Sequence, residues 1–236
     1  MGISRKWSAV AALGVLVLAL VLFGSSATQA EKGATWLVNG TKLGATSVGV
    51  QEVEGKELPL RALFAVFSTV TEFRCSNLEL INFVLLPEGS GSGKVRFTGC
   101  KFFVKGMEIS ACAPELEGKV GVIETLKLKA LIVLHKLESG STDPLVRIEP
   151  SEGELLAHIG KSKECSASSG SFGGVVYLKD SAGKLTVEQL THLVEPGPLT
   201  NVFFDVKGSS AATLDGSALL GLIAEHQGRQ WSAFPS

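Results

Sequence analysis

Short apolar runs broken by glycine, proline, serine and asparagine recur along the chain, and this pattern predicts β-strands joined by turns. Charged and apolar residues alternate over 94–98, which is the two-residue period of a strand that buries one face. Apolar residues also occupy every second position from Leu126 onward, which favours a strand over a helix within 120–137. The further segments with strand-like patterns are 36–39, 46–53, 60–70, 72–76, 78–86, 145–149, 155–159, 174–179 and 202–207.

Helical signals are few. Thr186–Leu190 begins with a threonine suited to an N-cap and has Gln189 three residues later, so it predicts a helix of a turn or two that ends before Pro196. In Ser217–Gln227, alternating apolar residues and an internal glycine favour a strand. The chain is therefore expected to be all-β or mainly β, an antiparallel β-sandwich or β-barrel with at most one or two short helices, stapled by disulfides.

Two stretches rich in glycine and serine, 87–93 and 166–174, are expected to be surface loops. The second would be the boundary if the chain had two subdomains, but no repeat or linker supports that division. The apolar run within 60–70 predicts a strand covered on both faces. We expect a single β-rich domain over 31–236.

The first 30 residues have the layout of a secretory signal peptide. Arg5 and Lys6 precede an uninterrupted apolar run, Trp7–Phe23, and small residues over 24–30 follow it. We expect cleavage after Ala30 and a mature protein that is secreted, extracellular or held at the cell surface. The alternative is a retained membrane anchor, because this run is close to the roughly 20 residues needed to span a bilayer.

Composition narrows the possible partners. Without residues 1–30 the chain has 206 residues and a formal charge of −3, and this length is enough for a sizeable core in one domain. A charge near zero without a basic stripe argues against nucleic acid as a partner. The apolar run 131–134 is flanked by lysines, so no membrane span is expected after removal of the leader.

The four cysteines are expected to form two disulfides, because exported chains fold in an oxidising compartment. A hairpin folded symmetrically about Gly106 places Cys100 opposite Cys112, at a distance suited to a bridge. This predicts a Cys100–Cys112 disulfide, and Cys75–Cys165 follows by elimination, although a one-residue slip would break the argument. A zinc site is disfavoured because no two cysteines have the close spacing of zinc ligands.

Motifs for catalysis are incomplete. No serine-nucleophile, phosphate-binding or calcium-binding motif is intact, so no catalytic residue, metal site or cofactor is predicted. A histidine-based triad is conceivable, because triads assemble from distant segments. Its candidates are His158 or His192, with Asp143, Asp180 or Asp205 as the acidic partner.

Trp231 is the one candidate for an exposed aromatic platform that binds a ligand such as a sugar. It lies in a polar stretch, 225–231, whereas the phenylalanines lie in apolar runs typical of a core. The alternative, which we favour, is that its side chain staples the terminal strand onto the core.

The chain resembles a group of exported proteins of soil actinobacteria, the Solirubrobacter-like lineages, to which no activity is assigned. The resemblance implies secretion and a β-rich structure, and it implies no site residues. It rests on Trp36–Gly40, on Phe97–Cys100 with Cys112, on Leu190–Leu193, and on Leu214–Ala218 with Gly228 and Trp231.

Three functions remain. The first is a non-enzymatic module of the cell envelope or cell surface, acting by adhesion or ligand binding. The second is a secreted hydrolase of unrecognised type, which needs a histidine within hydrogen-bond reach of a serine and a carboxylate in an open cleft. The third is a barrel that holds a small apolar ligand, consistent with a hydrophobic fraction of 45%. A cavity of several hundred Å³ lined by leucine and phenylalanine would distinguish it from a packed sandwich.

Overall fold

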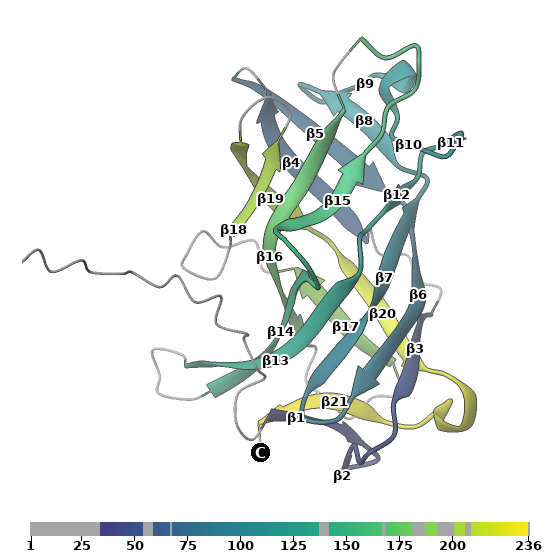
Figure 1. Ribbon diagram of the computed structural model, residues 1–236, viewed down its shortest axis with the longest axis vertical. Helices are drawn as coiled ribbons and strands as arrows, with labels where there is room; N and C mark the ends of the chain where they lie inside the picture. Colours follow the sequence, from purple (N-terminus) through teal and green to yellow (C-terminus); the bar gives the residue numbers. More distant parts are fainter. Residues whose placement is uncertain are drawn as a thin grey trace, which may run out of the picture.

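The secondary structure is almost entirely β. The computed structural model describes residues 34–53, 59–66, 68–136, 142–166, 169–180, 187–192, 201–205 and 209–235. Within these ranges there are 21 β-strands and two 3₁₀ turns, η1 (Ser110–Cys112) and η2 (Ala224–His226), as Figure 1 shows. The predicted all-β class is therefore confirmed. No helix in the described part is long and apolar enough to cross a membrane. The leader predicted over 1–30 lies outside the described residues.

Eight antiparallel strands form a closed ring, in the lower part of Figure 1. The ring closes because β14 pairs with β13 on one side and with β16 on the other, which leaves no free edge among these strands. Round the ring the order is β14, β13, β7, β6, β3, β20, β17 and β16. In chain order their bounds are β3 Val48–Glu52, β6 Asn77–Leu86, β7 Ser90–Thr98, β13 Leu128–Lys136, β14 Thr142–Pro150, β16 Gly170–Asp180, β17 Val187–His192 and β20 Ser217–Leu222.

The long strand β16 also belongs to a second sheet, in the upper part of Figure 1. Its residues 176–179 pair with β14 in the ring, whereas 170–175 pair with β15 and β18. From β18 the sheet continues through β19, β4, β5, β8 and β9. The bounds are β4 Leu60–Val66, β5 Thr69–Cys75, β8 Lys101–Val104, β9 Met107–Glu108, β15 Leu155–Ile159, β18 Asn201–Asp205 and β19 Ser209–Asp215. Three further strands are short: β10 (Glu115–Leu116) pairs with β11 (Lys119–Val120), and β12 (Ile123–Glu124) pairs with β7.

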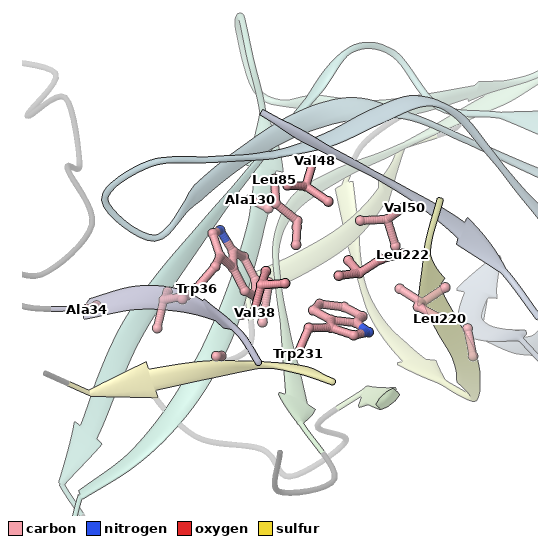
Figure 2. Packing of buried hydrophobic residues seen from close by; sticks show 14 residues of the cluster. Ala34, Trp36, Val38, Val48, Val50, Leu85, Ala130, Leu220, Leu222 and Trp231 are labelled. Carbon is pink, nitrogen blue, oxygen red and sulfur yellow. The ribbon is translucent and has the colours of Figure 1, made fainter. Parts of the chain in front are cut away.

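The two ends of the described chain pair with each other at the lower end of the ring. β1 (Ala34–Val38) pairs with β2 (Thr41–Lys42) and with β21 (Trp231–Pro235), and we call these three strands the terminal ribbon (Figure 1). Trp36 and Trp231 from this ribbon are each 2% exposed, and their ring centroids lie 6.0 Å apart. Figure 2 shows the two indole groups between the terminal ribbon and aliphatic side chains of strands that form the closed ring. Trp231 therefore staples the last strand to the core, which is the alternative that the sequence favoured, and it is not an exposed platform.

The core differs between the two halves of the molecule. Along β13 the alternate residues Leu128, Ala130 and Ile132 are buried, and the interior of the ring is mostly aliphatic. In the second sheet the core is aromatic, and the ring centroids of Phe64 and Phe204 lie 4.0 Å apart. The period-two pattern that predicted the strands thus also decides which residues are inside.

The prediction of surface loops for the glycine- and serine-rich stretches is wrong for the part of each that lies in a strand, whereas 87–89 form a turn as expected. Ser90–Thr98 forms β7, and 170–174 begins β16. A Cβ atom added at Gly93 would lie 2.4 Å from the Cα of Phe83, so any side chain there would collide with the neighbouring strand. Glycine in this strand marks a close approach, which the composition alone does not distinguish from a flexible loop.

Two other local predictions are wrong. The run 60–70 is a hairpin, because β4 and β5 turn at Ser68, whose φ is +63°. The helix predicted over Thr186–Leu190 is replaced by strand β17, with Thr186 itself outside the described residues. β17 pairs with β16 on one side and β20 on the other, and these neighbours supply hydrogen bonds that override a weak local helix signal.

The structure has two disulfides, Cys75–Cys100 and Cys112–Cys165, so the predicted pairs Cys100–Cys112 and Cys75–Cys165 are wrong. Cys75 ends β5 and Cys100 precedes its partner strand β8, so these two cysteines meet at the end of one ladder. The second disulfide joins η1 to the loop that follows β15.

The register of the β8–β9 hairpin explains the error. The predicted pair requires symmetry about Gly106, whereas Val104 pairs with Met107 and the axis falls between Lys105 and Gly106. Extended along the strands, this register brings residue 111 rather than 112 opposite residue 100. The chain also leaves the ladder at Ser110, where η1 begins.

Candidate functional site

An apolar cavity of about 150 Å³ lies in the interior of the molecule. Inward-facing residues of the ring line it, among them Leu85 on β6 and Val146 on β14, and it extends to Phe172 in the part of β16 that belongs to the second sheet. Trp36 and Trp231 of the terminal ribbon complete the wall. The cavity therefore combines residues from segments that are far apart in the sequence.

Small side chains help to leave this space. Ala130 on β13, Ala157 on β15 and Ala218 on β20 all line the cavity, and each is at most 9% exposed. Larger aliphatic residues at these inward positions would fill the interior, as the close packing of protein cores normally requires. The cavity is thus a property of the side-chain volumes and not only of the strand arrangement.

Few polar atoms reach the cavity wall. Thr125 is the only described lining residue with a hydroxyl group, and its Oγ1 accepts a hydrogen bond from the Val95 backbone N–H at 2.9 Å. The indole N–H of Trp36 donates to the carbonyl oxygen of Ser90 at 2.6 Å. The indole N–H of Trp231 is buried and has no acceptor within the described structure. The wall is therefore suited to a largely apolar occupant.

Glu52 is the ionisable residue at the inner face of β3, which it shares with Val48 and Val50. Its carboxylate accepts a hydrogen bond from the backbone N–H of Leu78, a lining residue, at 3.2 Å. Burial raises the pKa of the Glu52 carboxyl, and the hydrogen bond from Leu78 partly opposes that rise. Burial beside an apolar interior disfavours the charged carboxylate relative to the neutral acid.

A second group of candidate functional side chains lies on the outer face of the second sheet. His158, Ser171 and Asp205 are aligned in register across β15, β16 and β18. The His158 Nδ1 atom lies 2.9 Å from Ser171 Oγ, and both His158 and Asp205 are exposed. Serine occupies the middle of this row, whereas a catalytic triad has histidine between the serine and the acid.

The other sequence candidates are dispersed. Asp143 forms an ion pair with Lys179, at 3.3 Å between the charged atoms. His158 pairs with Ser171, eight residues before Lys179 on the same strand, so the structure does not bring Asp143 to His158. His192 and Asp180 belong to β17 and β16, but their side chains lie outside the described part. The structure thus joins His158 to Ser171, which is the central serine of an incomplete nucleophile motif over 169–173 that the sequence analysis interpreted as a loop.

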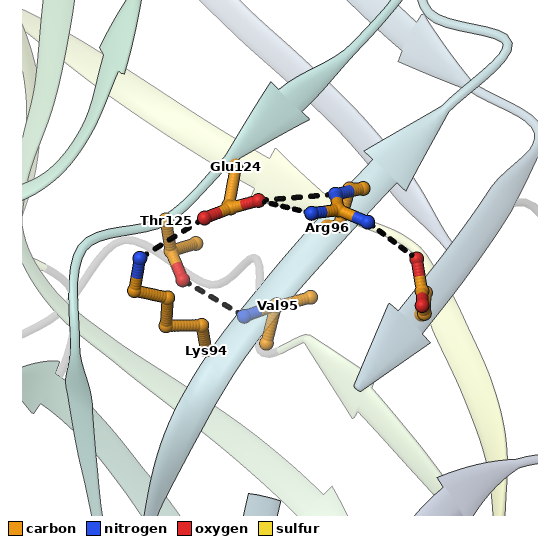
Figure 3. A network of polar contacts seen from close by, with 6 residues as sticks. Lys94, Val95, Arg96, Glu124 and Thr125 are labelled. Carbon is orange, nitrogen blue, oxygen red and sulfur yellow. Dashed lines mark hydrogen bonds and ion pairs between the residues drawn. The ribbon is translucent and has the colours of Figure 1, made fainter. Parts of the chain in front are cut away.

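A charged cluster ties β12 to β7, as Figure 3 shows. Its residues alternate along these strands with residues that line the cavity, so they lie on the opposite face. Glu124 accepts hydrogen bonds from Lys94 Nζ at 3.0 Å and from Arg96 Nη2 at 2.7 Å. Arg96 also donates to Glu79 at 3.0 Å. The hydrogen bond from Lys94, followed by that from Arg96, holds the pKa of Glu124 below its usual value against the effect of burial.

A similar cluster lies on the outer face of the second sheet. Glu72 is only 5% exposed and accepts hydrogen bonds from Arg74 Nε and Nη2 at 2.7 and 2.8 Å. Arg61 also donates to this carboxylate, and the Arg74 guanidinium lies 4.2 Å from the centre of the Phe103 ring. The hydrogen bonds from Arg74 and Arg61 lower the pKa of Glu72, whereas burial opposes this shift. Both charged clusters have the arrangement of structural contacts between strands.

No protein-family model, curated protein or solved structure matches this chain. The internal cavity is the site with the most specific geometry in the described part of the chain. A sequence signal for the cavity was present in the inward alanines, but their common direction depends on the strand pairing.

Proposed function

We propose that this protein is a non-enzymatic binding module that holds a small apolar molecule in its interior. The observation that supports the proposal is the cavity of about 150 Å³, whose described lining is apolar apart from Thr125 and the two indole nitrogens. Apolar cavities of this size stay free of water and take up benzene-sized molecules. Of the two actions expected of a surface module, an internal site favours ligand binding over adhesion.

The cavity volume limits the size of the ligand. At about 150 Å³ it is smaller than the several hundred Å³ of pockets that take drug-sized ligands. The ligand class we propose is therefore a molecule of about six to eight non-hydrogen atoms, comparable to the benzene-sized guests of such cavities. A long lipid chain does not fit this volume.

The compartment is part of the same proposal. The two disulfides support folding in an oxidising compartment, where such bonds persist. We propose that residues 1–30 direct export and that the mature protein acts outside the cytoplasm, at the cell envelope or beyond. Membership of the exported actinobacterial group remains a prediction.

Thermal unfolding with toluene and cyclohexane as probes tests the binding proposal. A ligand that binds only the folded state at one hundred times its dissociation constant stabilises the protein by about 2.7 kcal/mol, so the midpoint of unfolding should rise. Ala130→Leu, which fills the cavity wall, should weaken probe binding by at least about tenfold, the equivalent of about 1.4 kcal/mol. Ala65 lies on the exposed face of β4, so Ala65→Leu is the matched control and should bind like the wild type. Absence of any shift for the wild type, or equal binding by Ala130→Leu, would contradict the proposal.

A second candidate function is acyl hydrolysis, and the hydrogen-bond distance between His158 and Ser171 favours it. Ser171 Oγ would attack an acyl carbon while its proton passes to His158 Nδ1, and the bond to the leaving group would break as that group takes up the proton. Water would then hydrolyse the acyl-serine, which releases the acid and restores the serine hydroxyl. A fluorophosphonate probe should then label Ser171, with labelling reduced in His158→Ala. Ser210, which donates to the Phe204 carbonyl, provides the control Ser210→Ala. Failure of the wild type to react faster than Ser171→Ala would exclude this candidate.

A further inference from the structure

The terminal ribbon covers the lower end of the ring without being part of it. Its strands β1, β2 and β21 form a separate sheet, and none of them pairs with a ring strand in the described part of the chain. Trp36 and Trp231 of this ribbon nevertheless line the cavity, and each is 2% exposed. The ribbon is therefore a section of the cavity wall that is not built into the β-ladder of the ring.

Both connections between the ribbon and the ring start from the same side of the ring. Residues 43–47 lead from β2 to β3, and residues 223–230 lead from β20 to β21. β3 and β20 are neighbours in the ring, and the Ile223 N–H donates to the Gly49 carbonyl oxygen at 3.1 Å. A few loop residues can absorb the backbone rotation of a hinge, so two adjacent connections of this kind suit a hinge on this side.

The other end of the ribbon lies against the opposite side of the ring (Figure 1). The order of the eight ring strands places β14 opposite β3 and β13 opposite β20. β1 contacts β13, and β21 contacts both β13 and β14. A Cβ atom added at Gly89 would lie 3.0 Å from the Ala34 carbonyl oxygen, and the Trp36 indole N–H donates to the Ser90 carbonyl at 2.6 Å. Packing and this hydrogen bond thus hold the ribbon down at a distance from its two connections.

The rest of the described wall is held together more firmly. The ring has no free edge, and aromatic rings fill the core of the second sheet, with the Phe172 and Phe204 centroids 4.6 Å apart. The weakest ladder is that of β3 with β6, which has two residue pairs. Beyond these pairs the Glu52 carboxylate accepts the Leu78 N–H at 3.2 Å. Entry between β3 and β6 is therefore the competing route into the cavity.

We infer that the terminal ribbon is a lid, which swings away from β13 and β14 about its connections to β3 and β20 and lets the ligand enter and leave. The inference rests on the proposed function, because it assigns the entrance of the same cavity. Lifting the ribbon breaks the Trp36 hydrogen bond and the packing of two indole groups, whereas any other route separates paired strands or a packed core. The rate of opening of the ribbon then limits both binding and release.

Exchange of fluorobenzene between solution and cavity tests this route. Fluorine NMR on the full, disulfide-bonded chain gives the dissociation rate and the dissociation constant, and their ratio gives the association rate. Trp36→Phe loses the hydrogen bond to Ser90, so both rates should rise about fivefold, the usual effect of one hydrogen bond. Thr71→Val is the matched control, because it removes a buried hydrogen bond to the Phe64 carbonyl in the second sheet, and it should leave both rates unchanged.

Hydrogen exchange provides a measurement on the unaltered protein. If the ribbon lifts as a unit, the indole protons of Trp36 and Trp231 should have one common protection factor, lower than that of the amide protons of β13. Fluorobenzene at ten times its dissociation constant should slow both indole protons about tenfold, because it stabilises the closed state by this factor.

The possible results separate the lid from the binding proposal. A faster dissociation with an unchanged association rate in Trp36→Phe would show a lost contact and not a faster opening, and it would contradict the inference. Faster exchange in Glu52→Ala than in Trp36→Phe would place the entrance between β3 and β6, and unequal protection of the two indole protons would also exclude the lid. In each of these cases the proposed function stands. If the wild type gives no resonance of bound fluorobenzene, the proposed function fails and the inference fails with it.

Discussion

Replacing Cys112 and Cys165 together by alanine is expected to lower the free energy of unfolding by about 4 kcal/mol. The two cysteines are separated by 53 residues, and in the chain-entropy model a crosslink across such a loop restricts the unfolded chain by about this amount. Cys75–Cys100 closes a loop of 25 residues, so its removal should cost slightly less, about 3.5 kcal/mol. Urea unfolding of both double variants measures the difference. A loss below about 1 kcal/mol for either would contradict the role of that disulfide.

The pairing itself is checked by mass spectrometry of a tryptic digest without reductant. The structure requires peptide 75–94 linked to 97–101, and peptide 106–119 linked to 164–179. The pairing predicted from the hairpin would instead link 97–101 to 106–119. The two sets of masses are different, so a single digest decides between them.

Glu72→Gln is expected to lower the free energy of unfolding at pH 7 by about 2 kcal/mol, the usual size of hydrogen bonds to charged groups. The carboxylate is buried between Arg74 and Arg61, and their hydrogen bonds lower its pKa in the folded protein. A carboxyl whose pKa is lower in the folded state stabilises the fold above the unfolded pKa, near 4.5, and this contribution is lost as the pH falls through the folded pKa. The difference between wild type and variant should therefore be greatest at neutral pH and shrink below about pH 4.5.

Glu108→Gln is the matched control for this measurement. Glu108 pairs with Lys101 at 2.9 Å on the surface, and their side chains are 39% and 59% exposed. Exposed pairs contribute little, so this variant should change the free energy of unfolding by less than about 1 kcal/mol. A Glu72→Gln variant as stable as the control at pH 7 would show that the buried cluster does not hold the second sheet together.

The strands were the part of the fold most accessible from the sequence. Alternation over 94–98 and from Leu126 onward is a local property, because successive side chains of a strand point to opposite faces. The strands expected there lie within β7 and β13. Trp231 was likewise best explained as a staple of the last strand, and its burial agrees with this.

The wrong predictions share one physical cause, which is that a distant partner determined the local structure. Gly93 lies in a strand at a point where Phe83 passes too close for any side chain, and Val187–Leu190 belong to β17 because two neighbouring strands supply their hydrogen bonds. The disulfide error came from a shift in one hairpin register, which the residues around Gly106 do not specify. For the candidate site, the inward alanines were visible in the sequence, but the cavity that they border was not.

The sequence by itself determined the all-β class, the positions of most strands and the presence of enough cysteines for two disulfides, because alternation and composition are local properties. Only the tertiary structure decided the closure of the ring by β14 and β16, the pairing of Cys75 with Cys100, and the convergence of Trp36, Trp231 and Ala130 on one cavity. These features depend on which strands pair and in which register. A shift of one residue in that register reverses the direction of every side chain, and no local pattern specifies it.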